Sequence, residues 1–221
     1  MTTNNIVKIG RMVGKATAAA KVAAEALAAG EVIAVPTDTI YGIAALVQNK
    51  KAVEKLYAIK KRNPSKPIAI CVAEIEDIYN WADVTVAREV IEDLLPGQVT
   101  LVFRRSDLLN NNFNPDTELV GVRIPDYPFL REVCSMSAGP LALTSANYSA
   151  DTSTLQVEEF APLHDSLHTV FDGGRLHDSE NARLGSTVID LSQVGTFTII
   201  RPGSVREKVE KIMKLHRLEQ R

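Results

Sequence analysis

Residues 32–66, VIAVPTDTIYGIAALVQNKKAVEKLYAIKKRNPSK, decide the fold. They open within a short apolar run, EVIAVP, that is typical of a β-strand. Pro36 ends this run because proline has no N–H to donate to a sheet ladder. From Lys50 to Ile59 the apolar residues recur with helical spacing. A strand followed by a helix in this way is typical of an α/β domain.

Polar residues fill the point where this strand ends. The segment offers hydroxyls, one carboxylate and a glycine that allows close backbone approach: Thr37, Asp38, Thr39, Tyr41 and Gly42. Open α/β sheets usually bind their ligands beyond the carboxyl ends of the strands. We therefore expect this segment to line a binding site.

The helix is followed by four cations, Lys60, Lys61, Arg62 and Lys66. One explanation is a solvated helix end, where cations complement the C-terminal dipole. The other is a polyphosphate site, which would use the planar donors of arginine and the compact charge of lysine. Pro64 and Pro67 favour the second explanation, because they keep these side chains on an irregular loop instead of a continuing helix.

The overall composition gives no global basic field. The chain has 221 residues and a formal charge of −2, so any binding of phosphate or nucleic acid must come from a local patch. Cys71 and Cys134 lie far apart without metal-ligand spacing, which indicates core thiols in a reducing compartment. No apolar run reaches the roughly 18 residues that span a bilayer. We expect a soluble, cytoplasmic protein.

The N-terminal segment is rich in lysine and alanine and poor in acids, as transit peptides are, which leaves a mitochondrial pool open. A second explanation is stronger. The alanine-rich run from Lys15 to Ala29 is a strong helix former, and it ends at Gly30, where a helix C-cap would lie. We therefore expect a flexible segment over residues 1–11 and one domain over residues 12–221.

Strands and helices alternate along the rest of the chain. Strands are expected over residues 31–36, 67–73, 99–105, 119–125, 140–147, 168–171, 186–192 and 196–203. Helices are expected over residues 50–59, 85–95, 128–136, 156–162 and 205–216. Several connections are too short for a crossover helix, so the strand directions should be mixed. The predicted fold is a single α/β domain with a twisted, open, mixed sheet flanked by helices.

Five polar clusters follow or interrupt the apolar strands. They are Thr37 with Thr39 and Tyr41; Lys60 to Lys66; Arg123; Ser145 with Asn147, Ser149 and Ser153; and Ser186 with Thr187 and Arg201. If the strand ends converge, the resulting mouth holds several arginines and hydroxyls and few acids. That combination is typical of a pocket for an anion with several phosphates or carboxylates.

Each cluster also has a purely structural explanation. Ser145 and Asn147 are residue types that cap turns, and for this motif alone that explanation is favoured. Arg123 lies between two apolar residues, where an unpaired guanidinium is costly. It must therefore meet either a ligand anion or an internal carboxylate such as Asp126. The same two alternatives hold for Arg201.

Several chemistries have no support in the sequence. The four histidines show no metal-ligand spacing. Phosphate-loop, dinucleotide and nucleophile-elbow motifs are absent from the sequence. What remains is a reaction that needs positioning and charge neutralisation more than protein acids and bases, as phosphoryl or nucleotidyl transfer does.

A set of short motifs resembles one known family. In chain order they are PTDTIYGIA, the KxR pattern at Lys60 and Arg62, KPIAICV, PGQVTLVF, VGVRIPD, ALTSAN, GSTVIDL and IIRPG. Together they run from about Gly14 to Pro202 and resemble the YrdC family, the L-threonylcarbamoyladenylate synthases. KPIAICV and RLGSTVIDLS are most similar to the eukaryotic members. Each motif is weak alone, but their order over nearly the whole chain is specific.

The resemblance implies a YrdC-like fold and a reaction. L-threonine, bicarbonate or carbon dioxide, and ATP accompanied by Mg²⁺ give threonylcarbamoyl-AMP and pyrophosphate. A separate transferase complex then places the threonylcarbamoyl group on N6 of adenosine 37 in tRNA. This chain would therefore need only a weak contact with tRNA, and no membrane span.

The resemblance also implies roles for particular residues. Lys60 and Arg62 would be catalytic; Thr39, Arg123 and Ser186 would bind threonine; and Arg62, Lys66, Ser145, Asn147, Ser153 and Arg201 would bind ATP. Lys66 stands where Asn or His is frequent in the family, and Cys71 stands where a His can contact threonine. These two departures leave the corresponding contacts open. The resemblance implies no resident metal site.

Two other functions remain as alternatives. A concave basic surface can bind RNA, but RNA recognition uses aromatic platforms, and aromatic residues make up only 5% of this chain. A sibling enzyme can form carbamoyladenylate from carbamoyl phosphate, as the related domain of hydrogenase-maturation proteins does. That domain normally comes with fused partner domains.

Overall fold

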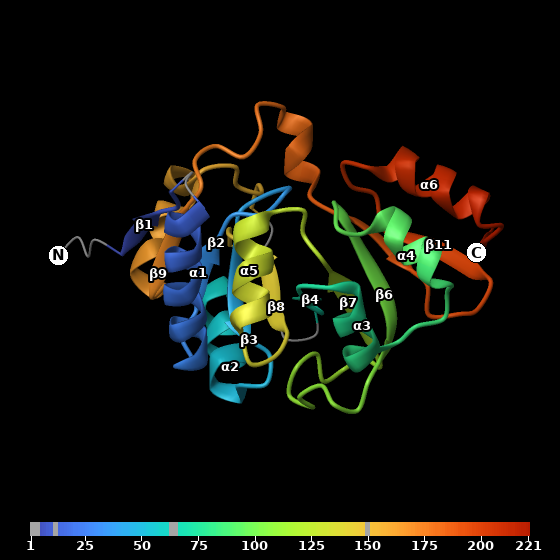
Figure 1. Ribbon diagram of the computed structural model, residues 1–221, viewed down its shortest axis with the longest axis horizontal. Helices are drawn as coiled ribbons and strands as arrows, with labels where there is room; N and C mark the ends of the chain where they lie inside the picture. The colour runs from blue at the N-terminus through green and yellow to red at the C-terminus, as the bar shows by residue number, and fades with distance from the viewer. Residues whose placement is uncertain (1–4, 11–12, 62–65, 149–150) are drawn as a thin grey trace.

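A computed structural model describes residues 5–10, 13–61, 66–148 and 151–221 (Figure 1). Its strands are β1 (Ile6–Lys8), β2 (Ile33–Val35), β3 (Gly42–Leu46), β4 (Ala69–Cys71), β5 (Ala82–Asp83), β6 (Val99–Arg105), β7 (Leu119–Arg123), β8 (Leu141–Ser145), β9 (Thr169–Asp172), β10 (Thr187–Asp190), β11 (Thr196–Arg201) and β12 (Glu219–Gln220). Its α-helices are α1 (Val13–Ala28), α2 (Lys50–Lys60), α3 (Ile75–Trp81), α4 (Arg88–Leu94), α5 (Pro128–Met136) and α6 (Arg206–Leu215). Two 3₁₀ helices are η1 (Val157–Ser166) and η2 (Glu180–Leu184).

The strands form one mixed sheet, as the sequence predicts. Across the described residues the order is β1-β9-β2-β3-β8-β4-β7-β6-β10-β11-β12, and β5 pairs with β6. β3 runs antiparallel to both β2 and β8. β4 pairs in parallel with β7, and β6 pairs in parallel with β10. Because the sheet order departs from the chain order, strands that are distant in the sequence share the middle of the sheet.

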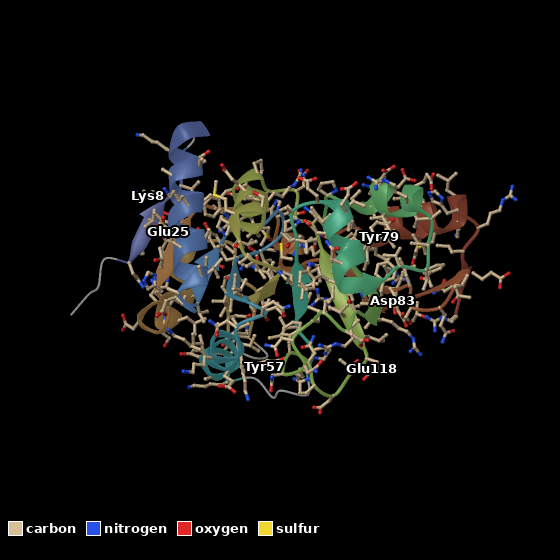
Figure 2. The ribbon with its side chains drawn as sticks, turned by 60° about the horizontal axis from the view of Figure 1, so that its bottom comes forward. Lys8, Glu25, Tyr57, Tyr79, Asp83 and Glu118 are labelled. Carbon is tan, nitrogen blue, oxygen red and sulfur yellow. The ribbon has the colours of Figure 1, made fainter. Side chains whose placement is uncertain are left out.

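One apolar cluster holds α1 and α5 on the sheet. These helices lie side by side in front of β2, β3 and β8 (Figure 1). The cluster includes Leu27 from α1 and Leu130 from α5, both fully buried. Ala20 and Ala23 on α1 are also fully buried, and their small side chains let the helix approach closely. Glu25, on the opposite face of α1, points to the outer surface (Figure 2).

A second, larger apolar cluster joins α2, α4 and the strands β6 and β7. It includes Leu56 of α2, Ile91 of α4 and Phe103 of β6, and each of these side chains is fully buried. The sheet is therefore covered by helices over both halves, so its strand ends are held in fixed positions.

Local backbone chemistry sets both ends of α2. The Asn49 side chain accepts a hydrogen bond from the Ala52 N–H at 3.2 Å, which caps the start of the helix. At the other end Lys61 adopts a left-handed conformation with φ 47°, and its N–H donates to the Ala58 carbonyl. The helix therefore ends with Lys60 as its last residue.

Most of the elements expected from the sequence are present, but the short elements β5, β12 and η2 were not predicted, and four other elements differ. β3 and α3 were not predicted, and the helix expected over residues 156–162 is the 3₁₀ helix η1, which contains Pro162. β1 pairs in parallel with β9, so the prediction of a flexible segment over residues 1–11 is wrong for residues 6–8. None of the helices in the described ranges is long and apolar enough to cross a membrane.

Candidate active site

One cavity of about 330 Å³ lies against one face of the sheet and is lined by residues of strands β3, β4, β6, β7, β8, β10 and β11. Among the described residues, its polar lining contains members of four of the five predicted clusters: Thr37, Tyr41, Arg123, Ser145, Ser153, Ser186 and Arg201. The polar ends of separate strands therefore do meet at a common mouth.

Two glycines, Gly42 and Gly121, form part of the cavity floor, where a side chain would not fit. A Cβ atom added at Gly42 would lie 2.7 Å from Leu143 Cδ1 and 3.2 Å from the Thr144 carbonyl. A Cβ atom at Gly121 would lie 3.0 Å from Thr100 Cγ2. Both glycines line the cavity, so larger residues there would displace the floor as well as fill the space.

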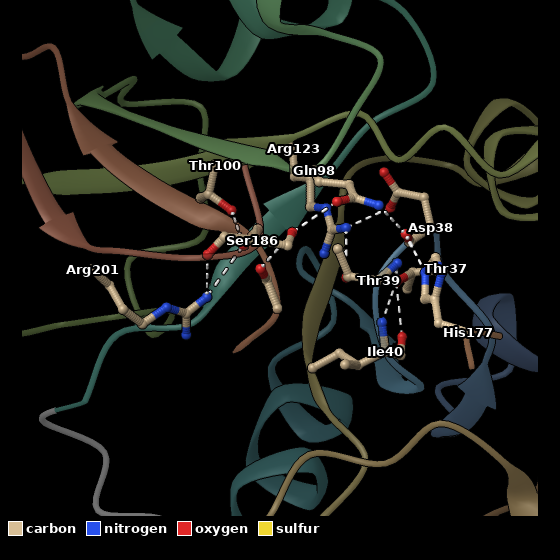
Figure 3. Close-up of polar contacts among 12 residues, drawn as sticks. Thr37, Asp38, Thr39, Ile40, Gln98, Thr100, Arg123, His177, Ser186 and Arg201 are labelled. Atoms are coloured by element: carbon tan, nitrogen blue, oxygen red, sulfur yellow. Dashed lines mark hydrogen bonds and ion pairs between the residues drawn. The ribbon is translucent and has the colours of Figure 1, made fainter. Parts of the chain in front are cut away.

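The Arg123 side chain reaches the cavity from β7 and is only 8% exposed. Its Nη2 forms an ion pair with Asp38 and donates a hydrogen bond of 2.8 Å to Thr39 Oγ1 (Figure 3). Arg123 thus pairs with an internal carboxylate, and this carboxylate is Asp38. The suggested Asp126 is exposed and is not the partner.

The Asp38–Arg123 pair leaves hydrogen-bonding capacity unused. Arg123 Nε and Asp38 Oδ2 are both buried without a hydrogen-bond partner in the described part of the chain. The Asp38 backbone is held separately, because its carbonyl accepts hydrogen bonds from Gln98 Nε2 at 2.7 Å and from His177 Nε2 at 2.9 Å. A carbonyl only accepts, so His177 carries its proton on Nε2.

The sequence placed Asp38 in the expected site but did not pair it with Arg123, and it gave no indication of Gln98 and His177. The signal for Asp38 was present, since a buried arginine requires a counter-ion and Asp38 is the acid within the threonine-rich strand end. Gln98 and His177 carry no such signal, because they reach Asp38 from 60 and 139 residues away.

Lys60 lies beneath the turn that follows β8. Its side chain is almost fully buried, at 1% exposure. Nζ donates to the Ser145 carbonyl at 2.5 Å and to Asn147 Oδ1 at 2.9 Å, and it also contacts the Asn147 carbonyl. Lys60 of the predicted KxR signature is therefore adjacent in space to the SxN signature, with Ser145 lining the cavity.

Arg201 and Ser186 meet on the opposite wall (Figure 3). Arg201 Nη2 donates to the Ser186 carbonyl at 2.9 Å and to Ser186 Oγ at 3.2 Å. Ser186 Oγ also lies 2.8 Å from Thr100 Oγ1. The neighbouring backbone is tightly packed, because a Cβ atom on Gly203 would lie 2.4 Å from the Ser186 carbonyl carbon.

The remaining predicted residues have different outcomes. Arg62 lies outside the described residues. Lys66 is exposed and does not line the cavity, although the adjacent Pro67 does. Cys71 is buried in the cluster under α1 and α5, where the Cys134 and Cys71 sulfurs lie 3.5 Å apart. The Cys134 thiol donates a hydrogen bond to Cys71 Sγ, and this bond together with burial raises the pKa of Cys134.

The comparisons with known proteins agree with this geometry. A model of the Sua5/YciO/YrdC family, described as telomere recombination, matches residues 25–203. This chain belongs to that family. The resemblance found in its motifs is thereby confirmed.

Named relatives of this Sua5/YciO/YrdC chain are enzymes. Proteins named threonylcarbamoyl-AMP synthase from Mus musculus and Homo sapiens are 48% and 47% identical to it over 200 residues, which cover 90% of this chain and 71% and 72% of theirs. A crystal structure of P. abyssi Sua5 complexed with L-threonine has a TM-score of 0.81 and 27% identity. The match covers 98% of this chain and 62% of that one, so this chain spans less than two thirds of that neighbour.

Proposed function

We propose that this chain makes threonylcarbamoyl-AMP and pyrophosphate from L-threonine, bicarbonate or carbon dioxide, and ATP. The observation that carries the proposal is one cavity lined by Arg123, Ser145, Ser186 and Arg201, in a chain of the Sua5/YciO/YrdC family. The names of its mammalian relatives support the same activity.

The Arg123 side of the cavity suits the amino acid. Nη2 is occupied by Asp38 and Thr39, and within the described residues Nη1 makes no hydrogen bond. A guanidinium with a free edge in a largely buried position binds a carboxylate well. We assign Arg123 to the threonine carboxylate, and Thr39 and Ser186 to the other polar groups of threonine.

The Arg201 side suits the nucleotide. Arg201, Ser145 and Ser153 line the cavity, and we assign them to the nucleotide, with Arg62 and Lys66 on its phosphates as the family resemblance implies. Asn147 and Lys60 support this side from behind, because they fix the turn that presents Ser145. The proposal thus gives Lys60 a positioning role in addition to the catalytic role that the resemblance implies.

The chemistry requires no side-chain nucleophile. The amine of threonine adds to carbon dioxide and loses a proton, which gives a carbamate. A carbamate oxygen then attacks the α-phosphorus of ATP, and the bond from that phosphorus to the bridging oxygen of pyrophosphate breaks. The cavity contributes by holding the two reactants in line and by offsetting negative charge with fixed cations and hydroxyls.

We assign Mg²⁺ to the MgATP substrate. Among the described residues no group of three or more His, Cys, Asp or Glu could hold a metal ion. The nearby Asp38 carboxylate is already engaged by Arg123. The ion would therefore arrive on the triphosphate, where it offsets the charge of the departing pyrophosphate.

We further propose that the product passes to a separate tRNA threonylcarbamoyl transferase complex, with a weak tRNA contact by this chain. The setting would be the cytoplasm, with a mitochondrial pool as the alternative. Tyr41 does not favour direct RNA binding: its ring is fully buried 5.4 Å from Phe160, and its hydroxyl donates to the Gly174 carbonyl at 2.7 Å. Such a ring offers no face on which a base could stack.

The test is pyrophosphate release by the purified chain with ATP, bicarbonate, Mg²⁺ and L-threonine. We expect release that depends on threonine, with serine a poor replacement, and a product whose mass equals threonylcarbamoyl-AMP. Equal pyrophosphate release without threonine would refute the substrate assignment. Release with carbamoyl phosphate in place of threonine and bicarbonate would support the sibling activity instead.

A further inference from the structure

A long connection crosses the molecule from one side of the sheet to the other. Residues 173–186 join β9, second in the sheet order, to β10, which lies beyond β6. In Figure 1 this orange segment passes over the top of the molecule, and it contains η2. We call residues 173–186 the strap. Its last residues, Leu184, Gly185 and Ser186, form one wall of the cavity.

Arg183 ties this strap to the opposite wall. Its Nη1 donates to the Ser153 carbonyl at 2.7 Å and to Glu159 Oε2 at 2.7 Å, and its Nη2 donates to Glu159 Oε1 at 3.1 Å. Nε forms a further ion pair with Glu180 on the strap itself. The planar guanidinium therefore uses its fork to join two parts of the chain that are 30 residues apart in sequence.

Ser153 depends on this contact more than its neighbours do. Ser153 lines the cavity, and in the described part of the chain the bond from Arg183 is the one hydrogen bond it makes. The Thr154 carbonyl is held independently, because it accepts from the Tyr41 N–H at 2.9 Å. The Leu155 N–H donates at 2.9 Å to Glu159 Oε2, which also accepts from Arg183. Ser186, across the cavity, has its own bonds to Thr100 and Arg201.

We propose that Arg183 is a positioning residue for the nucleotide side of the cavity, which fixes the width between Ser153 and the end of the strap. This inference rests on the proposed synthase function for its substrate. In this assignment Arg183 does not contact the reacting atoms. It acts by holding the Ser153 carbonyl in position. Its loss should therefore weaken ATP binding more than threonine binding, because Ser186 keeps its other partners.

The strap contains a matched control, Arg175. It approaches the same carboxylates, but at 3.7 Å from Glu159 and 3.6 Å from Glu180, and its side chain is 37% exposed. It makes no hydrogen bond to Ser153 among the described contacts. Removing Arg175 therefore changes the charge of the strap by the same amount while leaving the link between the walls in place.

The experiment compares wild type with Arg183→Met, Arg183→Lys and Arg175→Met. Steady-state kinetics with ATP and threonine varied separately give KM and kcat, and calorimetric titration with ATP gives binding without turnover. For Arg183→Met we expect a KM for ATP and a Kd for ATP raised about tenfold, as the loss of a charge-assisted hydrogen bond predicts. The KM for threonine and kcat should change by less than about threefold.

Arg183→Lys keeps the charge but cannot reach both partners with one planar group, so its KM for ATP should lie between those of wild type and Arg183→Met. Arg175→Met should match wild type. An unchanged KM for ATP in both Arg183 variants would overturn the proposal. So would equal changes in kcat and in both KM values, because a merely structural role predicts that pattern.

These results can be separated from a failure of the proposed function. If wild type itself releases no pyrophosphate with threonine, the synthase assignment fails. Titration with ATP still tests the positioning role, because it compares the Kd for ATP of wild type with that of the Arg183 variants. If wild type is active and ATP affinity is the same in all four proteins, the positioning role alone fails. Thermal melts of each variant establish that the compared proteins are folded.

Discussion

Replacing Asp38 by asparagine tests whether the site is built around a neutralised arginine. The Arg123 and Asp38 side chains are 8% and 7% exposed, so their ion pair is almost completely removed from water. Asparagine keeps the size and one acceptor oxygen, but it leaves the guanidinium without a counter-charge. Removing one partner of a buried pair costs 3–5 kcal/mol, and because Arg123 borders the cavity and keeps its bond to Thr39, we take the low end, about 3 kcal/mol.

A loss of about 3 kcal/mol lowers Tm by about 6–12 °C in a chain of this size. The assay is urea unfolding, and the control is Glu54→Gln. Glu54 pairs with Lys50 at 3.9 Å on the surface, so this substitution should change the free energy of unfolding by less than about 0.5 kcal/mol. An anion should restore part of the loss, so pyrophosphate or threonine should raise the Tm of Asp38→Asn more than that of wild type. Stability equal to the Glu54→Gln control, with no extra anion effect, would refute the reasoning.

Two further predictions concern the walls of the cavity. Gly203→Ala places a methyl group 2.4 Å from the Ser186 carbonyl carbon and the Thr187 nitrogen. We therefore expect urea unfolding to show a stability loss of about 1–3 kcal/mol, and kinetics to show a raised KM for threonine. The control is Gly14→Ala, which has nothing within 4 Å of the added methyl group and should be neutral or stabilising in the same assays. The hydrogen bond from Arg183 lowers the pKa of Glu159 from its ordinary value of 4.5, so this ion pair stabilises the fold above pH 4.5, and the benefit is lost as the pH falls through the lowered value. The stability difference between wild type and Arg183→Met in urea unfolding should therefore narrow as the pH falls through the lowered pKa, and a constant difference would contradict this.

Sequence periodicity predicted most of the sheet and the helices, because apolar spacing reports directly on burial. It missed β3, whose five buried residues follow the polar Thr37–Tyr41 segment so closely that the turn chemistry masked the strand. β1 was missed for the opposite reason: three residues at the edge of a sheet carry too little pattern, and their position is set by pairing with β9, more than 160 residues away.

Sequence patterns pointed to residues that line the cavity where polar groups border a strand, as at Ser145 and Ser186, and their roles stay predictions. The site was not predicted where a contact depends on tertiary distance. For Arg123 the sequence left open a ligand anion or an internal carboxylate such as the neighbouring Asp126, whereas the carboxylate that it meets is Asp38, 85 residues earlier. Arg183 had no signal at all, because its partner Ser153 lies on a separate loop whose approach depends on the strap.

The same contacts explain how a chain with a formal charge of −2 can hold a site for several negative charges. Three cations in or beside the cavity are held by the protein: Lys60 by carbonyls of the turn after β8, Arg123 by Asp38, and Arg201 by the Ser186 carbonyl. Fixed donors need no reorganisation when charge develops in the reaction, which is the main source of electrostatic catalysis. A carbonyl or a single carboxylate restrains these cations without cancelling the potential of the whole group. The cavity can therefore remain attractive to a triphosphate while the fold avoids the repulsion that free cations at this spacing would cause.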